Sequence, residues 1–108
     1  MSPSGKRQKS HRWQDDPYTQ KAMKEGYVAR SIYKLEEIDQ KFAVFDPTVR
    51  TVLDIGCAPG SRLQYVSERL KPQHHPGSTI IGIDLKPIEI TLPGISTYVG
   101  DATDRDVV

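Results

Sequence analysis

The stretch that decides the fold is residues 51–61, which read TVLDIGCAPGS. The first five residues are rich in β-branched side chains and do not alternate with polar ones, which is the pattern of a strand buried in a parallel sheet. Gly56 and Gly60 then mark a turn, and RLQYVSERL at 62–70 has its apolar residues at helical spacing. The segment therefore predicts a strand, a glycine-containing turn and a helix in succession.

Two more strands are expected downstream of this unit. TIIGID at 79–84 and ISTYVGD at 95–101 have the same short, β-branched character, whereas LKPIEITLPG at 85–94 has no clear helical pattern. A strand, a helix and another strand in this order predict a right-handed crossover and hence a parallel sheet. The expected fold class is α/β, with the first half of a doubly wound, mostly parallel sheet.

The N-terminal third predicts two helices. Residues 15–17, DDP, are expected to form a turn or cap ahead of a first helix over 18–25, which Gly26 interrupts. The segment 28–42 predicts a second, amphipathic helix. Its expected core-facing residues are Ile32, Leu35, Ile38 and Phe42. Lys34 falls on the rim of that face, where a long side chain packs its stem and exposes its ammonium group.

The charge is distributed unevenly along the chain. The 108 residues are 36% hydrophobic and 27% charged, which is typical of one globular domain, and the net charge is +1. Residues 1–34 nevertheless hold eight basic and three acidic residues, and the remainder is acidic. Residues 1–12 have almost no apolar side chain and are expected to be a disordered basic arm. The asymmetry suggests a polyanion partner, although charge alone does not exclude a solvated tail.

Composition also excludes several classes of protein. A single cysteine, Cys57, excludes a disulfide framework and fits a reducing compartment. No apolar run approaches the roughly 18 residues of a membrane span, and the N-terminus lacks the apolar core of a signal peptide. We therefore expect a cytoplasmic protein with no membrane partner. His74 and His75 have no cysteine or carboxylate at ligand spacing, so no metal site is expected.

The ends of the three expected strands carry the candidate ligand-binding residues. Asp54 and Gly56 lie at the end of the first strand, Asp84 ends the second and Asp101 ends the third. Ligands of open α/β sheets bind beyond the carboxyl ends of the strands. Asp84 suits a ribose diol, because a carboxylate accepts two hydroxyl hydrogen bonds, and Asp101 suits an amino group such as that of adenine. Each aspartate alone is typical of a cap or a loop, so the hypothesis depends on the ordered set.

The turn lacks two common nucleotide-binding motifs. Gly56 and Gly60 are four residues apart with Pro59 between them, which differs from the G-x-G-x-x-G spacing of dinucleotide-binding oxidoreductases. The turn also lacks the G-x-x-x-x-G-K-[ST] pattern of a phosphate-binding NTPase loop. An NAD-dependent oxidoreductase and a P-loop NTPase are therefore disfavoured.

The stretch VLDIGCAPGS at 52–61, with DPYTQKAMKEGYVARSIYKLEEIDQKF upstream of it, resembles the FtsJ-type RNA 2′-O-ribose methyltransferase family. The resemblance covers residues 13–101 and depends on A-R-S-x-x-K-L, A-P-G, I-D-L and G-D occurring in this order. It implies the N-terminal part of a Rossmann-like S-adenosylmethionine-dependent methyltransferase domain over 13–108, with a basic N-terminal helical extension. The implied reaction transfers a methyl group to a ribose 2′-hydroxyl of RNA, in the ribosomal branch a uridine of large-subunit ribosomal RNA.

The resemblance also implies roles for single residues. Asp54 and Gly56 match the acidic residue and the first glycine of the cofactor motif, and Gly60 matches a glycine that contacts the methionine part of the cofactor. Asp84 and Asp101 match the carboxylates at the ends of the second and third strands. The basic residues of the N-terminal part are then expected to bind RNA phosphates. These candidates are Lys6, Arg7, Lys9, Arg12 and Arg30.

The chain departs from the family in two respects. Arg62 holds the aligned position of a tryptophan that touches the cofactor. Lys34 matches the first lysine of a Lys-Asp-Lys-Glu catalytic set, but the other three members follow the third strand in the family and have no counterpart here. We therefore expect the 108 residues alone to be inactive, with TVLDI as an exposed edge strand.

Two alternatives to a ribosomal RNA methyltransferase stay open: a tRNA methyltransferase, and a catalytically incomplete fragment that binds the cofactor or RNA. Trp13 and Tyr18 either stack on RNA bases or pack against the first helix.

Overall fold

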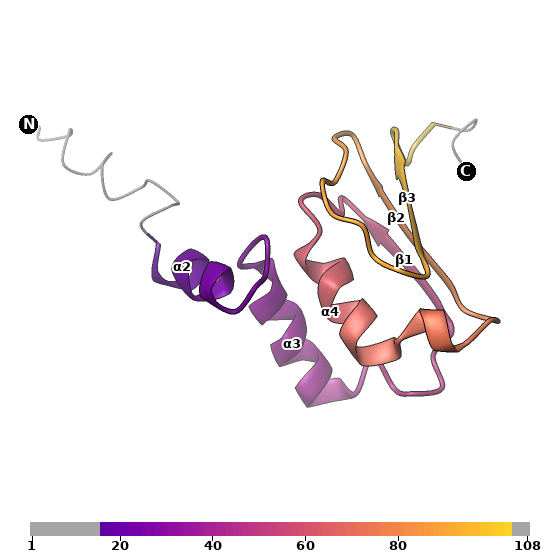
Figure 1. Ribbon diagram of the computed structural model, residues 1–108, viewed down its shortest axis with the longest axis horizontal. Helices are drawn as coiled ribbons and strands as arrows, with labels where there is room; N and C mark the ends of the chain where they lie inside the picture. The colour runs from indigo at the N-terminus through magenta and orange to yellow at the C-terminus, as the bar shows by residue number, and fades with distance from the viewer. Residues whose placement is uncertain (1–15, 105–108) are drawn as a thin grey trace, which may run out of the picture.

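The computed structural model describes residues 16–104. It contains a parallel three-stranded sheet in the order β1-β2-β3, with helices α3 and α4 packed together on one side of it (Figure 1). The elements in chain order are α2 (Pro17–Lys24), α3 (Ser31–Phe42), β1 (Thr51–Ile55), α4 (Ser61–Leu70), the short 3₁₀ helix η2 (Pro72–His74), β2 (Thr79–Asp84) and β3 (Ile95–Val99). The α/β class, the parallel pairing and the positions of all three strands confirm the prediction from the sequence. No helix among the described residues is long and apolar enough to cross a membrane.

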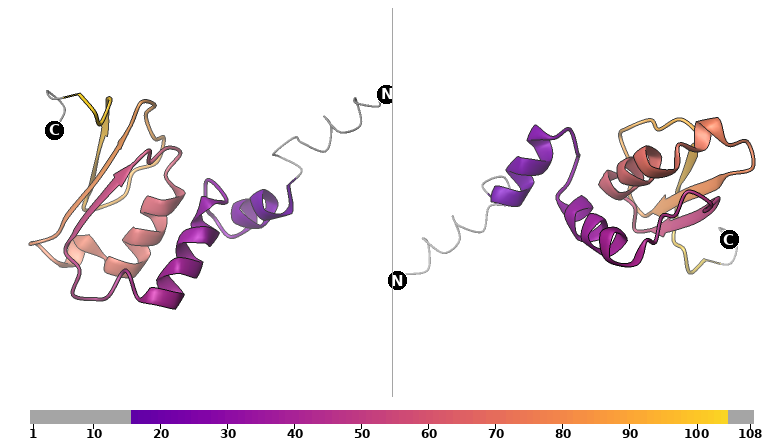
Figure 2. Two further views of the ribbon diagram at one scale, coloured as in Figure 1. Left: turned by 180° about the vertical axis from the view of Figure 1, so that it is seen from behind. Right: turned by 90° about the horizontal axis from the view of Figure 1, so that it is seen from below.

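Helix α4 packs directly on the middle of the sheet. Its apolar stripe is buried, as the helical spacing predicted, and Figure 2 shows the helix lying across one face of the strands. Gly82 of β2 permits this close packing, because a Cβ there would lie 2.6 Å from the Leu63 Cδ1 atom and 2.9 Å from the Cys57 Sγ atom. The turn that precedes α4 therefore packs closely against β2.

Strand β1 is less buried than its sequence predicted. Among residues 16–104 it pairs only with β2 and forms one edge of the sheet, as expected. Leu53 and Ile55 are 57% and 61% exposed, because no described helix covers the face of the sheet opposite α4. The strand over 51–55 and its place at an exposed edge are as expected, whereas the burial that its residue pattern predicted is not found on this face among residues 16–104.

The face that α3 buries differs from the predicted one. Ile32 is buried and Leu35 is half-buried, but Ile38 and Phe42 are 36% and 69% exposed. Among the described helices, α4 is the main packing partner of α3, so only a narrow stripe is covered. Asp39, a residue that the hydrophobic pattern did not select, completes this stripe and is 4% exposed.

Asp39 joins α3 to α4 through polar contacts. Its carboxylate accepts hydrogen bonds from the Tyr65 hydroxyl at 2.6 Å and the Phe45 backbone amide at 2.8 Å, and it pairs with the Arg69 Nε atom at 3.3 Å. Burial raises the pKa of Asp39, but these contacts outweigh the effect of burial and hold its pKa below the ordinary value. The helix pair is thus held by an ionised, fully partnered carboxylate.

Helix α2 has the start and the end that the sequence predicted. The Asp16 carboxylate accepts the Thr19 backbone amide at 2.9 Å and caps the helix. The pKa of Asp16 is lowered, chiefly by the hydrogen bond from Arg30. Gly26 then adopts a φ of +90°, a conformation that favours glycine, and separates α2 from α3.

Candidate cofactor site at the carboxyl edge of the sheet

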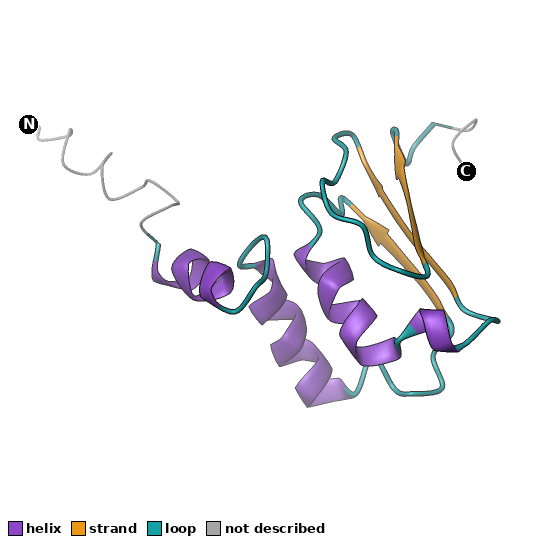
Figure 3. Ribbon diagram, viewed as in Figure 1, coloured by secondary structure: helices purple, strands orange, loops and turns teal. Residues whose placement is uncertain are grey.

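A hollow of about 290 Å³ lies at the carboxyl ends of the three strands. Its lining brings together residues that are far apart in the sequence, and Figure 3 shows the loops after the strands gathering at this end of the sheet. The lining residues are Ile55, Gly56, Ile83, Asp84, Leu85, Gly100, Asp101, Ala102 and Thr103. Three of the predicted cofactor residues, Gly56, Asp84 and Asp101, therefore meet in one hollow.

Asp84 is oriented by backbone amides on both sides. Its Oδ2 atom accepts the Ala58 amide at 3.0 Å, and its Oδ1 atom accepts the Lys86 amide at 2.8 Å. These hydrogen bonds hold the pKa of Asp84 below its ordinary value. A carboxylate oxygen has two acceptor positions, so both oxygens keep capacity for a ligand's hydroxyl groups.

Asp101 is ordered by its own loop. Its Oδ1 atom accepts the Thr103 hydroxyl at 2.6 Å and the Thr103 amide at 2.8 Å, an Asx-turn arrangement. The same contacts lower the pKa of Asp101. Both hydrogen bonds use the same oxygen, and Asp101 lines the hollow.

The turn after β1 is tied to β2 at its first residue. The Gly56 amide donates to the Ile83 carbonyl at 2.8 Å, and Gly56 has a φ of +76°, a left-handed conformation that favours glycine. The next residue, Cys57, is 3% exposed, and burial raises the pKa of its thiol. The backbone around Gly56 therefore stands open to the hollow while Cys57 anchors the turn beneath it.

Asp54 and Arg62 pair with one another beside the hollow. The Arg62 Nη2 atom lies 3.1 Å from the Asp54 Oδ1 atom and also donates to the Gly56 carbonyl, and the Arg62 Nε atom lies 3.2 Å from the same carboxylate oxygen. Neither residue lines the hollow. The structure thus places both predicted cofactor residues around the turn and not in the lining.

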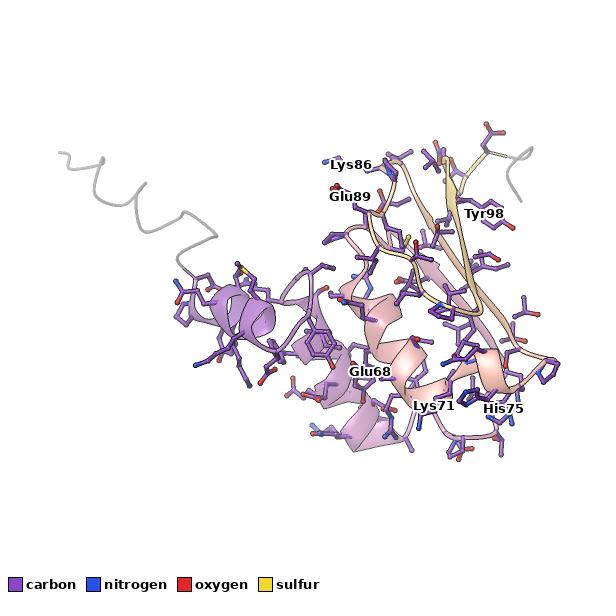
Figure 4. The ribbon with its side chains drawn as sticks, in the orientation of Figure 1. Glu68, Lys71, His75, Lys86, Glu89 and Tyr98 are labelled. Atoms are coloured by element: carbon purple, nitrogen blue, oxygen red, sulfur yellow. The ribbon has the colours of Figure 1, made fainter. Side chains whose placement is uncertain are left out.

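Gly60 is the residue before the first turn of α4, with a φ of +122°. The connector between β2 and β3 covers it, because a Cβ at Gly60 would lie 2.9 Å from the Ile90 Cδ1 atom. Gly60 is buried and does not line the hollow. Figure 4 shows Lys86 and Glu89 on the same connector.

The structure does not bring Lys34 into contact with the hollow. Its side chain is 77% exposed on α3, and its Nζ atom lies 3.4 Å from the Glu37 Oε1 atom. The predicted position on the rim of a buried face is wrong, because the neighbouring Ile38 is itself exposed.

Among the predicted RNA-binding residues, the structure describes Arg30, which pairs with Asp16 at 2.7 Å and is 58% exposed. The other RNA-binding candidates and Trp13 lie outside the described residues: Lys6, Arg7, Lys9 and Arg12.

A clamp between the α2–α3 loop and α4 was not predicted from the sequence. The Gln64 side chain accepts the Val28 amide at 3.0 Å and donates to the Gly26 carbonyl at 3.1 Å, while the Tyr27 hydroxyl donates to Glu68 at 2.6 Å. Nothing in the local sequence signals these partners, which are more than 35 residues apart in the chain. In residues 16–104, no group of three or more His, Cys, Asp or Glu side chains is arranged to hold a metal ion.

A parallel sheet with a glycine turn after β1 and acidic residues at the ends of β2 and β3 defines a Rossmann-like fold of the methyltransferase type. The model of the FtsJ-like methyltransferase family matches residues 27–108. The chain belongs to this family.

Curated relatives give the family match more detail. The chain is 41% identical over 93 residues to a protein named ribosomal RNA large subunit methyltransferase E in Syntrophobacter fumaroxidans, covering 85% of this chain and 45% of the relative. It is 47% identical over 85 residues to the protein of the same name in Desulforapulum autotrophicum, covering 79% of this chain and 39% of the relative. The chain therefore spans less than half the length of these relatives.

A solved structure resembles this chain in both fold and sequence. It is the crystal structure of a protein described as a ribosomal RNA methyltransferase from Plasmodium falciparum, with a TM-score of 0.60 and 32% sequence identity. The match covers 74% of this chain and 41% of that one. The structural likeness therefore extends over most of the described sheet and helices.

Proposed function

We propose that this chain supplies the cofactor-binding part of an S-adenosylmethionine-dependent RNA methyltransferase, which methylates a ribose 2′-hydroxyl of large-subunit ribosomal RNA. The observation that carries the proposal is the meeting of Gly56, Asp84 and Asp101 in one hollow at the carboxyl edge of the sheet. The names of the curated relatives support ribosomal RNA as the substrate class.

The residues of the hollow fit the adenosine part of the cofactor. Asp84 is held ionised, so it suits the two hydroxyl groups of a ribose, while Asp101 suits the exocyclic amino group of adenine. Ile55, Ile83 and Leu85 offer apolar surface for the base. The volume of about 290 Å³ lies near the lower end of ligand pockets, roughly 300 Å³. It therefore matches the nucleoside better than the complete cofactor.

Methyl transfer needs the attacking hydroxyl to be positioned and its developing charge to be stabilised. The bound cofactor supplies an electrophilic methyl group on a sulfonium ion, and a ribose hydroxyl is a weak nucleophile near neutral pH. Lys34 is the residue of this chain that we assign to the reaction, because its ammonium group can orient the ribose and phosphate and stabilise negative charge. Its 77% exposed side chain leaves it accessible to an RNA strand.

The N-terminal residues are assigned to RNA. We propose residues 1–12 as a basic arm and 13–108 as the N-terminal part of the methyltransferase domain. Arg30 is 58% exposed and retains part of its guanidinium surface for a phosphate despite its pairing with Asp16. Lysine and arginine contacts to phosphates supply affinity that does not depend on sequence and that weakens with salt.

Calorimetric titration with S-adenosylmethionine tests the proposed cofactor site. Asp84→Ala and Asp101→Ala are expected to weaken binding on the order of tenfold each, since each loses an ionised acceptor. Asp46→Ala is the matched control, because Asp46 forms the same turn with Thr48 that Asp101 forms with Thr103, at the same 2.8 and 2.6 Å. Asp46 precedes β1 and does not line the hollow.

The outcomes separate the site from a general loss of folding. Asp101→Asn, whose Oδ1 atom can keep both hydrogen bonds from Thr103 while the charge is removed, should also bind weakly while its thermal transition stays near that of the unaltered protein. Equal cofactor affinity for Asp84→Ala, Asp101→Ala and the unaltered protein would contradict the assignment of the hollow.

A further inference from the structure

Helix α2 carries an aromatic and basic surface that the hollow does not use. Figure 1 shows α2 standing away from the sheet, on the far side of α3 from β1. Tyr18 is 60% exposed, and its ring lies 6.5 Å from the Tyr33 ring, centroid to centroid. The Lys21 Nζ atom lies 4.5 Å from the centroid of Tyr33. We define the α2 surface as Tyr18, Lys21, Lys24 and Tyr33.

The charge of this surface favours an anionic partner. The helix sequence PYTQKAMK contains two lysines and no acidic residue. Among residues 16–104, no carboxylate forms an ion pair with Lys21 or Lys24. The groove between α3 and α4 has the opposite character, since its charged lining residues are three acids and one base: Glu36, Asp39, Glu68 and Arg69. A polyanion is therefore attracted to the α2 surface and repelled from that groove.

Tyr18 is arranged to stack on a flat ligand. One part of its ring is supported by Tyr33, whose hydroxyl in turn donates to the Glu25 carboxylate at 2.5 Å. The rest of the ring is open to solvent. A supported aromatic ring loses little conformational freedom when a base stacks on it, and neighbouring lysines can contact the phosphates on either side of that base.

We infer that the α2 surface binds single-stranded RNA, with an unpaired base stacked on Tyr18 and the adjoining phosphates beside Lys21 and Lys24. The inference rests on the proposed function, which makes RNA the substrate. Tyr33 lies in the first turn of α3, directly before Lys34. The α2 surface and the proposed catalytic lysine are therefore at the same end of α3, so a strand held on Tyr18 continues toward Lys34.

Fluorescence anisotropy with a labelled, unstructured oligouridylate tests the inference on the full chain. Tyr18→Ala should weaken binding about five- to 150-fold, the range for loss of one base–aromatic stack, and Tyr18→Phe should bind within about twofold of the unaltered protein. Tyr98→Ala is the matched control. Tyr98 is 56% exposed, close to Tyr18 at 60%, and Figure 4 shows it on β3, on the opposite side of the molecule from α2.

A salt titration separates stacking from phosphate contact. Tyr18→Ala should lower affinity at every salt concentration and leave the slope of log affinity against log salt unchanged, because it removes no charge. Lys24→Ala should reduce that slope by about 0.7, the value for one phosphate contact on a single strand. Tyr18→Ala should not change the affinity for a duplex RNA of equal length, because the bases of a duplex are not free to stack on Tyr18.

Each result bears on the inference. Unchanged oligouridylate affinity of Tyr18→Ala, an equal loss in Tyr98→Ala, or no oligouridylate binding by the unaltered protein would overturn it. Stacking on Tyr18 without any binding of S-adenosylmethionine would support the α2 surface and contradict the proposed function. Cofactor binding without a Tyr18 effect would leave the proposed function standing and remove the α2 surface.

Discussion

The ion pair between Arg62 and Asp54 predicts a specific loss of stability on substitution of the arginine. Asp54 is 14% exposed and Arg62 is 32% exposed, so the pair is screened less than a surface ion pair. Arg62→Met leaves the Asp54 carboxylate largely buried without its cation, and it also removes the donor to the Gly56 carbonyl. A hydrogen bond to a charged group contributes about 1.5–3 kcal/mol, and the partial exposure of Arg62 favours the lower half, so we expect a loss of about 2 kcal/mol.

Thermal unfolding followed by circular dichroism measures this loss. About 2 kcal/mol corresponds to a lower Tm by about 8–16 °C for a domain of this size. In an Asp54→Leu background, where residue 54 offers no acceptor, the same Arg62→Met change should cost about 1 kcal/mol, because only the contact with the Gly56 carbonyl is then lost. Arg50→Met is the control, since the Arg50 guanidinium donates to the carbonyls of Pro47 and Val49 and pairs with no described carboxylate. An equal loss in both backgrounds would refute the coupling between Arg62 and Asp54.

Three further predictions follow from the other parts of the molecule. The pKa of Asp39 in the folded protein is lowered, so its charge stabilises the fold above the unfolded pKa of about 3.9, and this stabilisation disappears as the pH falls through the folded pKa. The free energy of unfolding of Asp39→Asn, measured by urea denaturation, should therefore fall less steeply between neutral and acidic pH than that of the unaltered protein. Lys34→Ala, made in the protein as its gene encodes it, should reduce methyl transfer on the order of 100-fold and leave cofactor affinity unchanged. Lys41→Ala, in the last turn of the same helix, should not reduce methyl transfer. Transfer of labelled methyl groups to ribosomal RNA measures both. Deletion of residues 1–12 should weaken RNA binding and flatten its salt dependence in filter binding, with cofactor affinity unchanged, and an identical slope would show that the arm does not contact RNA.

The sequence predicted the elements of the sheet well because local patterns determine them. The runs at 51–55 and 79–84 became β1 and β2 with the expected bounds, since short β-branched runs between turn residues have few alternatives. The meeting of Gly56, Asp84 and Asp101 followed from topology, because parallel strands bring their carboxyl ends to one edge.

The errors came from contacts that are distant in the chain. The spacing of α3 marked Ile38 and Phe42 as buried, yet only a narrow stripe of that helix meets α4, and the polar Asp39 occupies it. The partners of Asp39 come from the following loop and from α4, so no pattern within α3 reveals them.

The sequence did not predict that Ile90 packs over Gly60, for a similar reason. The connector between β2 and β3 has no periodic pattern, so the sequence gives no sign of where its side chains lie. The pairing of Arg62 with Asp54 likewise depends on the shape of the turn between them. Such contacts decide which of the predicted residues reach the hollow.

The proposed function depends on the binding of S-adenosylmethionine in the hollow at the ends of β1, β2 and β3. Titration of the isotope-labelled chain with S-adenosylmethionine, followed by amide NMR spectra, tests it most directly. We expect saturable shifts at the amides of Gly56, Leu85 and Gly100, with little change in the α3–α4 groove at Glu36 and Gln40. Shifts confined to that groove, or no saturable shift at the three hollow residues, would contradict it.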